Sequence, residues 1–301
     1  MRINPNMVPD ILAAIQGTQS QETTALEQLS TGKRVNKPSD DPAASAEMVQ
    51  NQVLSGQVDQ YTTDASGVLD MMHTIDSSLS AVVTSVNQAI SVGTEGANST
   101  VTTSQRQAMA EQVQGIFASV LNAANLSYNG SYLFGGTAST SPPYTADSTS
   151  STGYKYNGNE DVNTVQIGAG FDLQTNLPGD QLFSNSGSDL LGSLNQLATA
   201  LQSGTTTDIA NATQQVTAGL NYLTQQRVFY GNAMSQINAQ ETFLSQETVN
   251  LKSQANTLIG ADATQAATML SQAQTANSAV LSAAAKIMPE TLLDYLPTTL
   301  G

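Results

Sequence analysis

Few residues of this chain have the type and spacing that catalysis or metal binding requires. His73 is the only histidine, there is no cysteine, and adjacent acids occur at 40–41 and 160–161. A single helical histidine is more often a flanking residue than a metal ligand or catalytic group. Acids that are adjacent in sequence project in different directions, and a turn or a helix cap explains each of the two acid pairs. The Gly-Ala-Gly at 168–170 lacks the third glycine of a dinucleotide fingerprint, and no HExxH, P-loop or GxSxG motif occurs. The sequence therefore predicts a protein that is not an enzyme, with no catalytic, cofactor-binding or metal site.

Charge and composition narrow the class of partner. Nine Lys and Arg against 24 Asp and Glu give a net charge of −15. Nucleic acid and anionic membranes are unfavourable partners, because both are bound through Lys and Arg. The apolar content of 39% is below the roughly 45–50% of ordinary globular domains, which favours an elongated shape or assembly with other copies. The N-terminal sequence has no apolar region of the length of a Sec signal, and no run approaches the ~20 residues of a transmembrane helix.

The densest cluster of charge lies in the segment LSTGKRVNKPSDDPAAS, residues 29–45. Its charged residues are Lys33, Arg34, Lys37, Asp40 and Asp41. Gly32 offers the left-handed conformation that commonly ends a helix, and the cations after it suit a helix C-terminus. Asp41 before Pro42 fits the N-cap and first position of a new helix. The segment therefore predicts a helix–corner–helix joint, although an ordinary charged surface loop is the simpler alternative and charge alone does not decide.

Two long stretches carry apolar residues at alternating spacings of four and three, which is a heptad pattern. The first stretch consists of Leu54, Val58, Tyr61, Ala65, Val68, Met72, Ile75, Leu79, Val82 and Val86. The second runs from Val216 to Leu258 with polar residues at Arg227, Glu241 and Thr248. Those polar positions either fix the register of the seam or show that the seam is only partly buried. We expect the helices at 54–86 and 216–258 to pack antiparallel, with a shorter helix at 105–128 alongside.

Arg227 is the one basic residue of these seams, and burying an unpaired guanidinium is costly. We therefore expect a carboxylate or several backbone carbonyls within its reach. Between the helical halves, from Gly135 to about Ser186, the chain is rich in Gly, Pro, Ser and Thr and carries short alternating segments. This predicts a small β insertion, in which Asn-Gly-Asn-Glu-Asp at 157–161 fits the turn of a hairpin.

The predicted fold is mainly α, an elongated antiparallel helical rod built from both chain ends, with a small inserted β domain. Terminal helices are expected at 1–36 and 263–301, the helical rod at 37–135 and 187–262, and the β insertion at 136–186. The C-terminal stretch presents mainly alanine, which has high helix propensity but buries little area. We therefore expect residues 1–30 and 263–296 to be poorly ordered in an isolated monomer and to form paired helices on assembly, so that protease cuts both ends first.

Three stretches together resemble the flagellin superfamily. LSTGKRVNKPSDDPAAS is similar to the N-terminal signature of flagellins and flagellar junction proteins, and RVFYGNAMSQINAQETFLSQETVNL, residues 227–251, resembles their C-terminal Arg-x-x-x-Gly segment. The alanine-rich end from Ala261 resembles their last helix. The tail Leu292-Leu293-Asp294-Tyr295-Leu296, together with NGSYLFGGT and NLPGDQLF around the insertion, resembles the junction-protein branch, the hook-associated proteins of type 3. Residues 297–301 extend past the usual end of that branch.

The resemblance implies a structural protein without a cofactor. It would leave the cell unfolded through the flagellar type III channel and assemble outside the cell. Its partners would be like subunits in a ring, the neighbouring hook-associated junction protein, flagellin and a flagellar export chaperone. The implied subunit-interface residues are Lys33, Arg34, Lys37, Asp40, Asp41, Arg227, Leu292, Leu293, Tyr295 and Leu296. Two other functions stay open at this point: a flagellin filament subunit, and a secreted coiled-coil effector or adhesin that acts without a hook.

Overall fold

A computed structural model describes residues 7–293 of the chain. The chain divides into two compact units, which are described separately below. Unit 1 comprises Met1–Gln57 and Glu247–Gly301, and unit 2 comprises Val58–Gln246. The three-part division predicted from the sequence stays a prediction.

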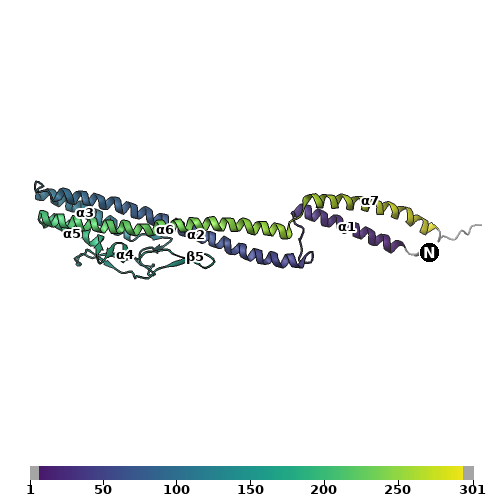
Figure 1. Cartoon of the computed structure of the whole chain (residues 1–301), viewed down its shortest axis with the longest axis horizontal. Helices are drawn as coiled ribbons and strands as arrows, with labels where there is room; N and C mark the ends of the chain where they lie inside the picture. The colour runs from purple at the N-terminus through teal and green to yellow at the C-terminus, as the bar shows by residue number, and fades with distance from the viewer. Residues whose placement is uncertain (1–6, 294–301) are drawn as a thin grey trace, which may run out of the picture. The chain divides into compact units, whose positions relative to one another are not determined.

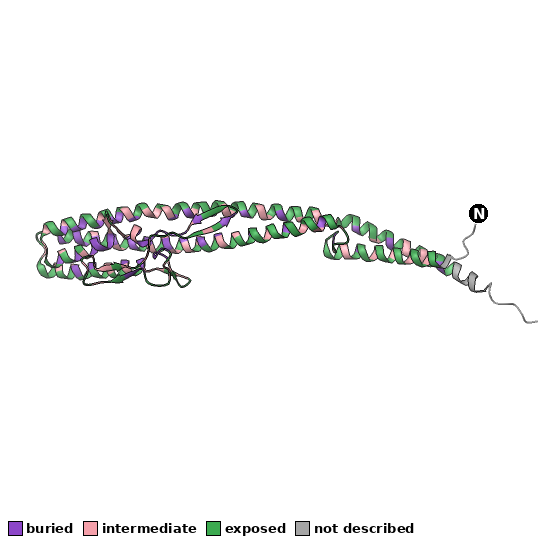
Figure 2. Ribbon diagram, turned by 90° about the horizontal axis from the view of Figure 1, so that it is seen from below, coloured by how far each residue is buried: buried purple, intermediate pink, exposed green. Residues whose placement is uncertain are grey.

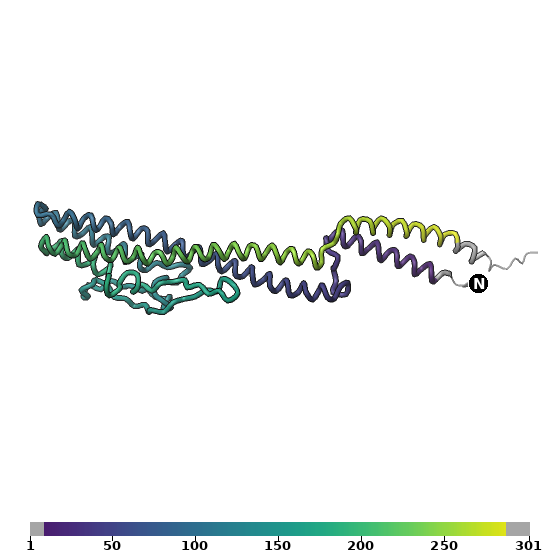
Figure 3. Tube along the Cα trace, in the orientation of Figure 1, coloured from purple at the N-terminus to yellow at the C-terminus, as the bar shows by residue number. Residues whose placement is uncertain are grey.

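Unit 1 is built from four helical segments that come from both ends of the chain. The helix α1 (Met7–Thr31) packs along α7 (Ala263–Leu293), and the two lie side by side in Figures 1 and 3. The other two segments are the first part of α2 (Pro42–Gly96) and the last part of α6 (Thr206–Ile259). Asn51 of α2 donates hydrogen bonds to the Leu251 carbonyl (3.1 Å) and the Gln254 side chain (2.9 Å) of α6. These bonds fix which residues of the two segments face each other.

Unit 2 contains the longer parts of α2 and α6, joined by α3 (Thr103–Ala124) and α5 (Leu190–Ser203). Asp76 of α2 bonds Arg227 of α6, and Gly93, further along α2, lies against Thr213. Because residue numbers rise along α2 as they fall along the facing α6, the two helices run antiparallel. Side chains of α3 join the same core. The predicted antiparallel packing with a third helix alongside is confirmed for unit 2.

The predicted seam forms the core of unit 2. Its fully or almost fully buried members include Ala65, Met72, Ile75, Leu79, Val82, Val86, Val216, Leu223, Tyr230 and Ile237. In α3 the buried residues Val113, Ile116 and Val120 follow the same spacing. Leu54, at the first position of the first seam, lies in unit 1 and is 42% exposed. Figure 2 shows the buried residues as purple turns on the helices of unit 2.

The segment between α3 and α5 forms four small antiparallel hairpins and one short helix. Their elements are β1 (Ser127–Tyr128) with β2 (Ser131–Tyr132), β3 (Tyr144–Ala146) with β4 (Tyr154–Tyr156), β5 (Thr164–Gly168) with β6 (Phe171–Gln174), α4 (Gly179–Leu182), and β7 (Ser184–Asn185) with β8 (Ser188–Asp189). The predicted small β insertion is therefore present. It packs on the helical core through Phe134, Tyr144, Ile167 and Phe183.

The hairpin predicted at Asn-Gly-Asn-Glu-Asp is wrong. β4, before this turn sequence, pairs with β3, and β5, after it, pairs with β6. Asn159 instead fixes the loop at 135–137: its backbone N–H donates to Gly135 O (3.1 Å) and its side-chain oxygen accepts from Thr137 N (2.8 Å). The turn residues are thus used for contacts to a distant loop, which a local turn signal does not reveal.

The fold is mainly α, with long helices from both chain ends and a small β insertion between them, as the sequence predicts. Within residues 7–293, no helix has the length and apolar character needed to cross a membrane.

Candidate assembly site at the corner between helices

The corner begins where the sequence places it, at the end of α1. Gly32 has a φ of +67° and donates its N–H to the Gln28 carbonyl at 2.9 Å, so it ends the helix in the left-handed conformation that glycine adopts most easily. The Thr31 hydroxyl bonds the Glu27 carbonyl (2.7 Å) and accepts the Lys33 N–H (3.2 Å). The predicted helix–corner–helix joint is confirmed, since α2 starts at Pro42.

A second segment of the chain, at the joint between α6 and α7, holds this corner in place. Lys33 and Gly260 form an antiparallel β-bridge. Two backbone hydrogen bonds flank the bridge, from Arg34 N to Ile259 O (2.7 Å) and from Ala261 N to Gly32 O (2.9 Å). The two helix joints of unit 1 are therefore clasped together through their backbones, independently of side-chain identity.

Arg34 adds a side-chain bond to the same clasp. One guanidinium nitrogen, Nη2, lies 3.0 Å from Asp41 Oδ2 and 3.0 Å from the Leu258 carbonyl. The Asp41 carboxylate also caps α2, because its Oδ1 accepts the Ala44 N–H at 3.1 Å. Asp41 therefore links the start of α2 to Arg34, whose guanidinium also bonds the end of α6.

The two acids of the corner are bound to backbone N–H groups, and both stay ionised more readily than free carboxyls. Asp40 Oδ2 accepts the N–H of Lys37 (2.9 Å) and of Asn36 (3.1 Å), which lowers the pKa of its carboxyl. The pKa of Asp41 is lowered first by the Ala44 N–H and then by Arg34. Hydrogen bonds of this kind favour the charged form. Asp40 and Asp41 therefore act as structural acceptors that shape the corner.

The lysines of the corner remain accessible to other molecules. Lys33 is exposed, and the Lys37 side chain is 67% exposed with only a long contact of 3.9 Å to Glu27. Such a pair contributes little in water. Of the predicted interface residues, the structure brings together the five at the corner, and it leaves Lys33 and Lys37 as the ones whose charge is free to meet a partner.

The remaining predicted interface residues lie elsewhere. Arg227 is in unit 2, where its Nη2 and Nε donate to Asp76 Oδ1 at 2.7 and 3.1 Å, so the expectation of a carboxylate partner is confirmed. It is 23% exposed at the side chain, and Glu241 and Thr248 are likewise half-buried. Leu292 and Leu293 lie in the last turn of α7, whereas Tyr295 and Leu296 lie outside the described residues. The role of all these residues in assembly stays a proposal.

Sequence reasoning missed the partner side of the clasp. Asp262 caps α7, since its Oδ1 accepts the N–H of Thr264 (2.8 Å) and of Gln265 (3.1 Å). Gly260 followed by an acid at 262 is the usual signal of one helix ending and another beginning, and it was present in the sequence. Asn51, 5% exposed, gave no such signal, because its partners are distant in the chain.

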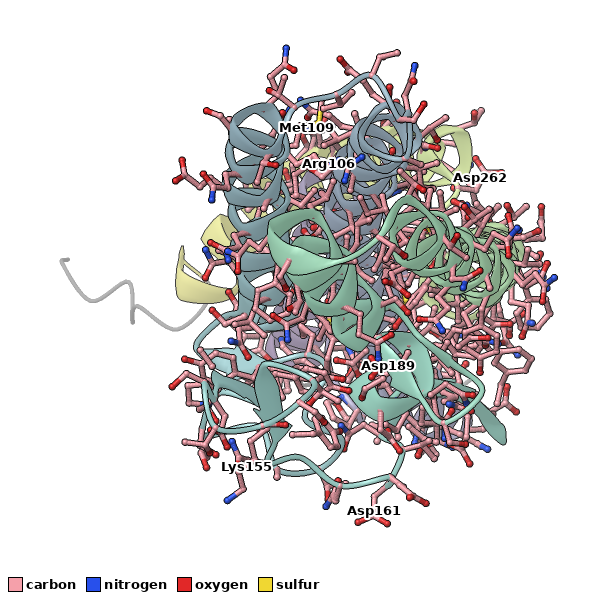
Figure 4. The ribbon with its side chains drawn as sticks, turned by 90° about the vertical axis from the view of Figure 1, so that its left-hand side faces the viewer. Arg106, Met109, Lys155, Asp161, Asp189 and Asp262 are labelled. Carbon is pink, nitrogen blue, oxygen red and sulfur yellow. The ribbon has the colours of Figure 1, made fainter. Side chains whose placement is uncertain are left out.

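Across residues 7–293 no group of His, Cys, Asp and Glu is placed to hold a metal ion. In unit 2 the charged side chains of Lys155 and Asp161 point outward from the β insertion (Figure 4). The chemistry of the corner is that of a structural joint.

Comparison with known proteins finds a family whose N-terminal sequence matches this chain across the corner. Residues 3–139 match the family model of the bacterial flagellin N-terminal helical region. Over this region, which is less than half of its length, the chain is similar to bacterial flagellins. The matched region contains α1, the whole corner, α2 and α3, and it does not include the 258–261 side of the clasp.

Two curated relatives of this chain carry the name flagellar hook-associated protein 3. Flagellar hook-associated protein 3 of Salmonella typhimurium is 30% identical over 187 residues, covering 62% of this chain and 57% of that protein. The chain spans little more than half the length of the curated relatives that it matches, 54% and 57%.

Solved structures support the fold. A flagellar hook-associated protein of Vibrio parahaemolyticus has a TM-score of 0.68 at 17% identity, covering 73% of this chain and 99% of its own. The flagellar junction protein FlgL of Legionella pneumophila has a TM-score of 0.61 at 12% identity, covering 71% of this chain and 100% of its own. At these identities the likeness concerns the fold.

Proposed function

We propose that this chain is a structural junction subunit of the bacterial flagellum, which links the hook side to the flagellin filament. The observation that carries the proposal is the sequence similarity to flagellar hook-associated protein 3, at 29% and 30% identity. The clasped corner supports the same role, because a joint held by two backbone hydrogen bonds can transmit force between helices. The chain acts through assembly and has no enzymatic role.

The partners follow from this role. Like subunits form a ring, with the neighbouring hook-associated junction protein on one side and flagellin on the other. A flagellar export chaperone binds the chain before it passes, unfolded, through the type III channel to the cell exterior. Lys33 and Lys37, the accessible cations of the corner, meet carboxylates of a neighbouring subunit. The terminal helices α1 and α7 line the inner wall of the tube that the assembled subunits form.

A deletion strain of the source bacterium tests the proposal by electron microscopy. Loss of a junction subunit leaves bare hooks and releases unpolymerised flagellin into the medium, and plasmid-borne wild-type chain restores filaments. A flagellin subunit would instead give shortened or altered filaments on deletion, and a secreted effector or adhesin would leave the flagella normal. Either result contradicts the proposal.

A further inference from the structure

Two Asn-Gly pairs occur in the segment between α3 and α5, and the structure places them in different surroundings. They are Asn129-Gly130 and Asn157-Gly158. Asn-Gly is the dipeptide in which an asparagine amide is lost most easily. The backbone nitrogen that follows the asparagine can attack the side-chain carbon, and glycine has no side chain to shield that nitrogen. Each pair is therefore a candidate site for a covalent change that requires no enzyme.

The first pair forms the tip of the β1–β2 hairpin. Asn129 and Gly130 have φ values of +50° and +82°, as the turn of a two-residue hairpin requires. Both residues are exposed, and a Cβ on Gly130 would meet no atom within 4 Å. Within residues 7–293, the Asn129 side chain and the Gly130 N–H take part in no hydrogen bond. Neither reacting group is therefore held in place by another residue.

The hairpin around Asn129 is small enough to open locally. The strands β1 and β2 pair over only two residues each. A two-stranded hairpin is marginally stable by itself, and parts of a protein with few buried contacts open at the lowest free energy. Opening matters because the Gly130 nitrogen reaches the amide carbon only after rotation about the Asn129 Cα–C bond.

The second pair is held by several contacts. The Asn157 side-chain amide donates to Thr145 Oγ1 (3.1 Å), and the Asn157 backbone N–H donates to Pro143 O (2.8 Å). A Cβ on Gly158 would clash with the Tyr156 hydroxyl group, so the tyrosine side chain lies directly against this glycine. Rotation at Asn157 therefore requires these hydrogen bonds to break and the aromatic side chain to move.

We propose that Asn129 is a site of spontaneous modification, at which the side-chain amide becomes a carboxylate, and that the fold preserves Asn157. The Gly130 nitrogen loses its proton to a base in the solvent and bonds to Asn129 Cγ. The Cγ–Nδ2 bond breaks, and the side-chain nitrogen leaves as ammonia with a proton from solvent, which gives a five-membered succinimide. Water then adds to either ring carbonyl. The ring opens to aspartate, or to isoaspartate, in which the main chain runs through the side-chain carbon.

The products differ from the parent chain in charge and in backbone. Either product adds one negative charge at the tip of the hairpin. Isoaspartate also adds a methylene group to the main chain, and a two-residue turn cannot keep the register of β1 and β2 after such a change. Because water is the only co-reactant, the modification accumulates with the age of each molecule. The proposal is independent of the proposed flagellar role.

Mass spectrometry of the full chain tests the proposal. Purified protein is incubated at mildly alkaline pH, folded in one arm and in urea in the other, and both arms are digested in parallel with a fresh sample. Peptides with an acid in place of Asn129 or Asn157 are counted, and isoaspartate is identified by labelling with an isoaspartyl methyltransferase. In the folded arm, the Asn129 product is expected to form about fivefold faster or more, since hydrogen bonds oppose the reaction at Asn157. In urea the two products are expected to form at similar rates.

Each other outcome of this experiment contradicts the proposal. Equal rates in the folded protein, or faster loss of Asn157, would overturn it. Absence of the Asn129 product from the folded arm would also overturn it, because the hairpin would then protect the site. A preference for Asn129 that is as large in urea as in the folded protein would show that the local sequence makes the selection, and not the fold.

The variant Asn129→Gly is the matched control, because glycine adopts a positive φ without strain and has no amide to lose. It is expected to unfold at the same urea concentration as the wild type and to give no product on this peptide. An unchanged amount of product would place the modification at another residue. In the wild type, the rate is expected to rise with hydroxide concentration, because the Gly130 nitrogen must lose a proton. A rate that does not depend on pH would exclude attack by that nitrogen.

Discussion

The two units are built largely from helices, but they bury very different side chains. In unit 2 the core holds Met72, Ile75, Leu79 and Tyr230, all with no exposed area, and α5 adds a set of buried leucines. In unit 1 the buried apolar residues of α1 and α7, among those whose burial is described (9–286), are Ala25, Ala266, Ala273 and Ala284. Several larger ones, Leu12, Leu26, Leu29, Met269 and Leu281, are 38–53% exposed.

This difference in buried side chains affects how much stability each unit gains from burying apolar area. At roughly 25 cal/mol per Å² of apolar area, an alanine methyl contributes far less than a leucine or an aromatic ring. Unit 2 therefore carries its own core of large apolar side chains, while α1 and α7 bury mainly alanine. The helix α1 packs along α7 within a single chain. The weak order of both ends in an isolated monomer stays a prediction.

The largest expected effect is a difference in unfolding free energy between two leucine substitutions in the seam, one in each unit. Leu79→Ala, at a position with no exposed area, is expected to cost about 2–5 kcal/mol of unfolding free energy, because it leaves a cavity in the core of unit 2. Leu54→Ala changes another leucine of the same seam that is 42% exposed, and about 1 kcal/mol or less is expected. Urea unfolding followed by circular dichroism measures both. Equal costs would show that the two units are packed alike.

A second contrast is expected at alkaline pH. Burial raises the pKa of Tyr156 to about 12 and shifts the pKa of Tyr144 and Tyr230 upward further. An unfolded tyrosine ionises near its ordinary pKa of about 10. The stabilisation is therefore fully present below pH 10 and is lost as the pH rises toward the folded values. All three lie in unit 2, whereas the one tyrosine of unit 1, at 295, is outside the described residues.

Tyrosinate absorbance together with hydrogen exchange checks this contrast. Ionisation of the buried tyrosines is expected to coincide with loss of amide protection in unit 2 above pH 10. The matched variant Tyr144→Phe removes the most buried hydroxyl of the insertion, which bonds Ser184, and is expected to move the loss of protection to higher pH. Ionisation at pH 10 without loss of protection would contradict the prediction.

The smallest expected effect on stability comes from two glycine substitutions, one just after the end of α1 and one in its interior. Gly32→Ala forces a side chain into a φ of +67° with open space around it, so backbone strain alone is expected to cost about 1 kcal/mol. Gly17→Ala lies in the exposed interior of α1, also in open space, and about 0.5–1 kcal/mol of stabilisation is expected. Hydrogen exchange of α1 amides measures both signs. A loss from both variants would mean that α1 is not an independent helix.

Much of the fold and part of the site could be predicted. The seam residues from Ala65 to Val86 are buried as their spacing indicates, and Gly32 and Pro42 mark the helix ends. The carboxylate partner of Arg227 followed from the cost of burying a lone cation. The partner of Arg34 on α6 did not, because Leu258 is 224 positions away in the chain. The hairpin at 157–161 failed for a similar reason, since its turn residues serve a contact to Gly135 and Thr137.

The sequence by itself determined the helical character of both ends, the seams, the helix ends at the corner and the superfamily resemblance, because periodicity, capping and backbone conformation are local properties. Only the tertiary structure decided which strands pair, which backbone groups clasp the corner, and that Leu54 is exposed while Asn51 is buried. The exposure of Leu54 and the burial of Asn51 depend on the register between α2 and α6, which long-range hydrogen bonds and side-chain volumes set together. A heptad pattern defines a face for each helix, but the partner helix determines which part of that face is covered.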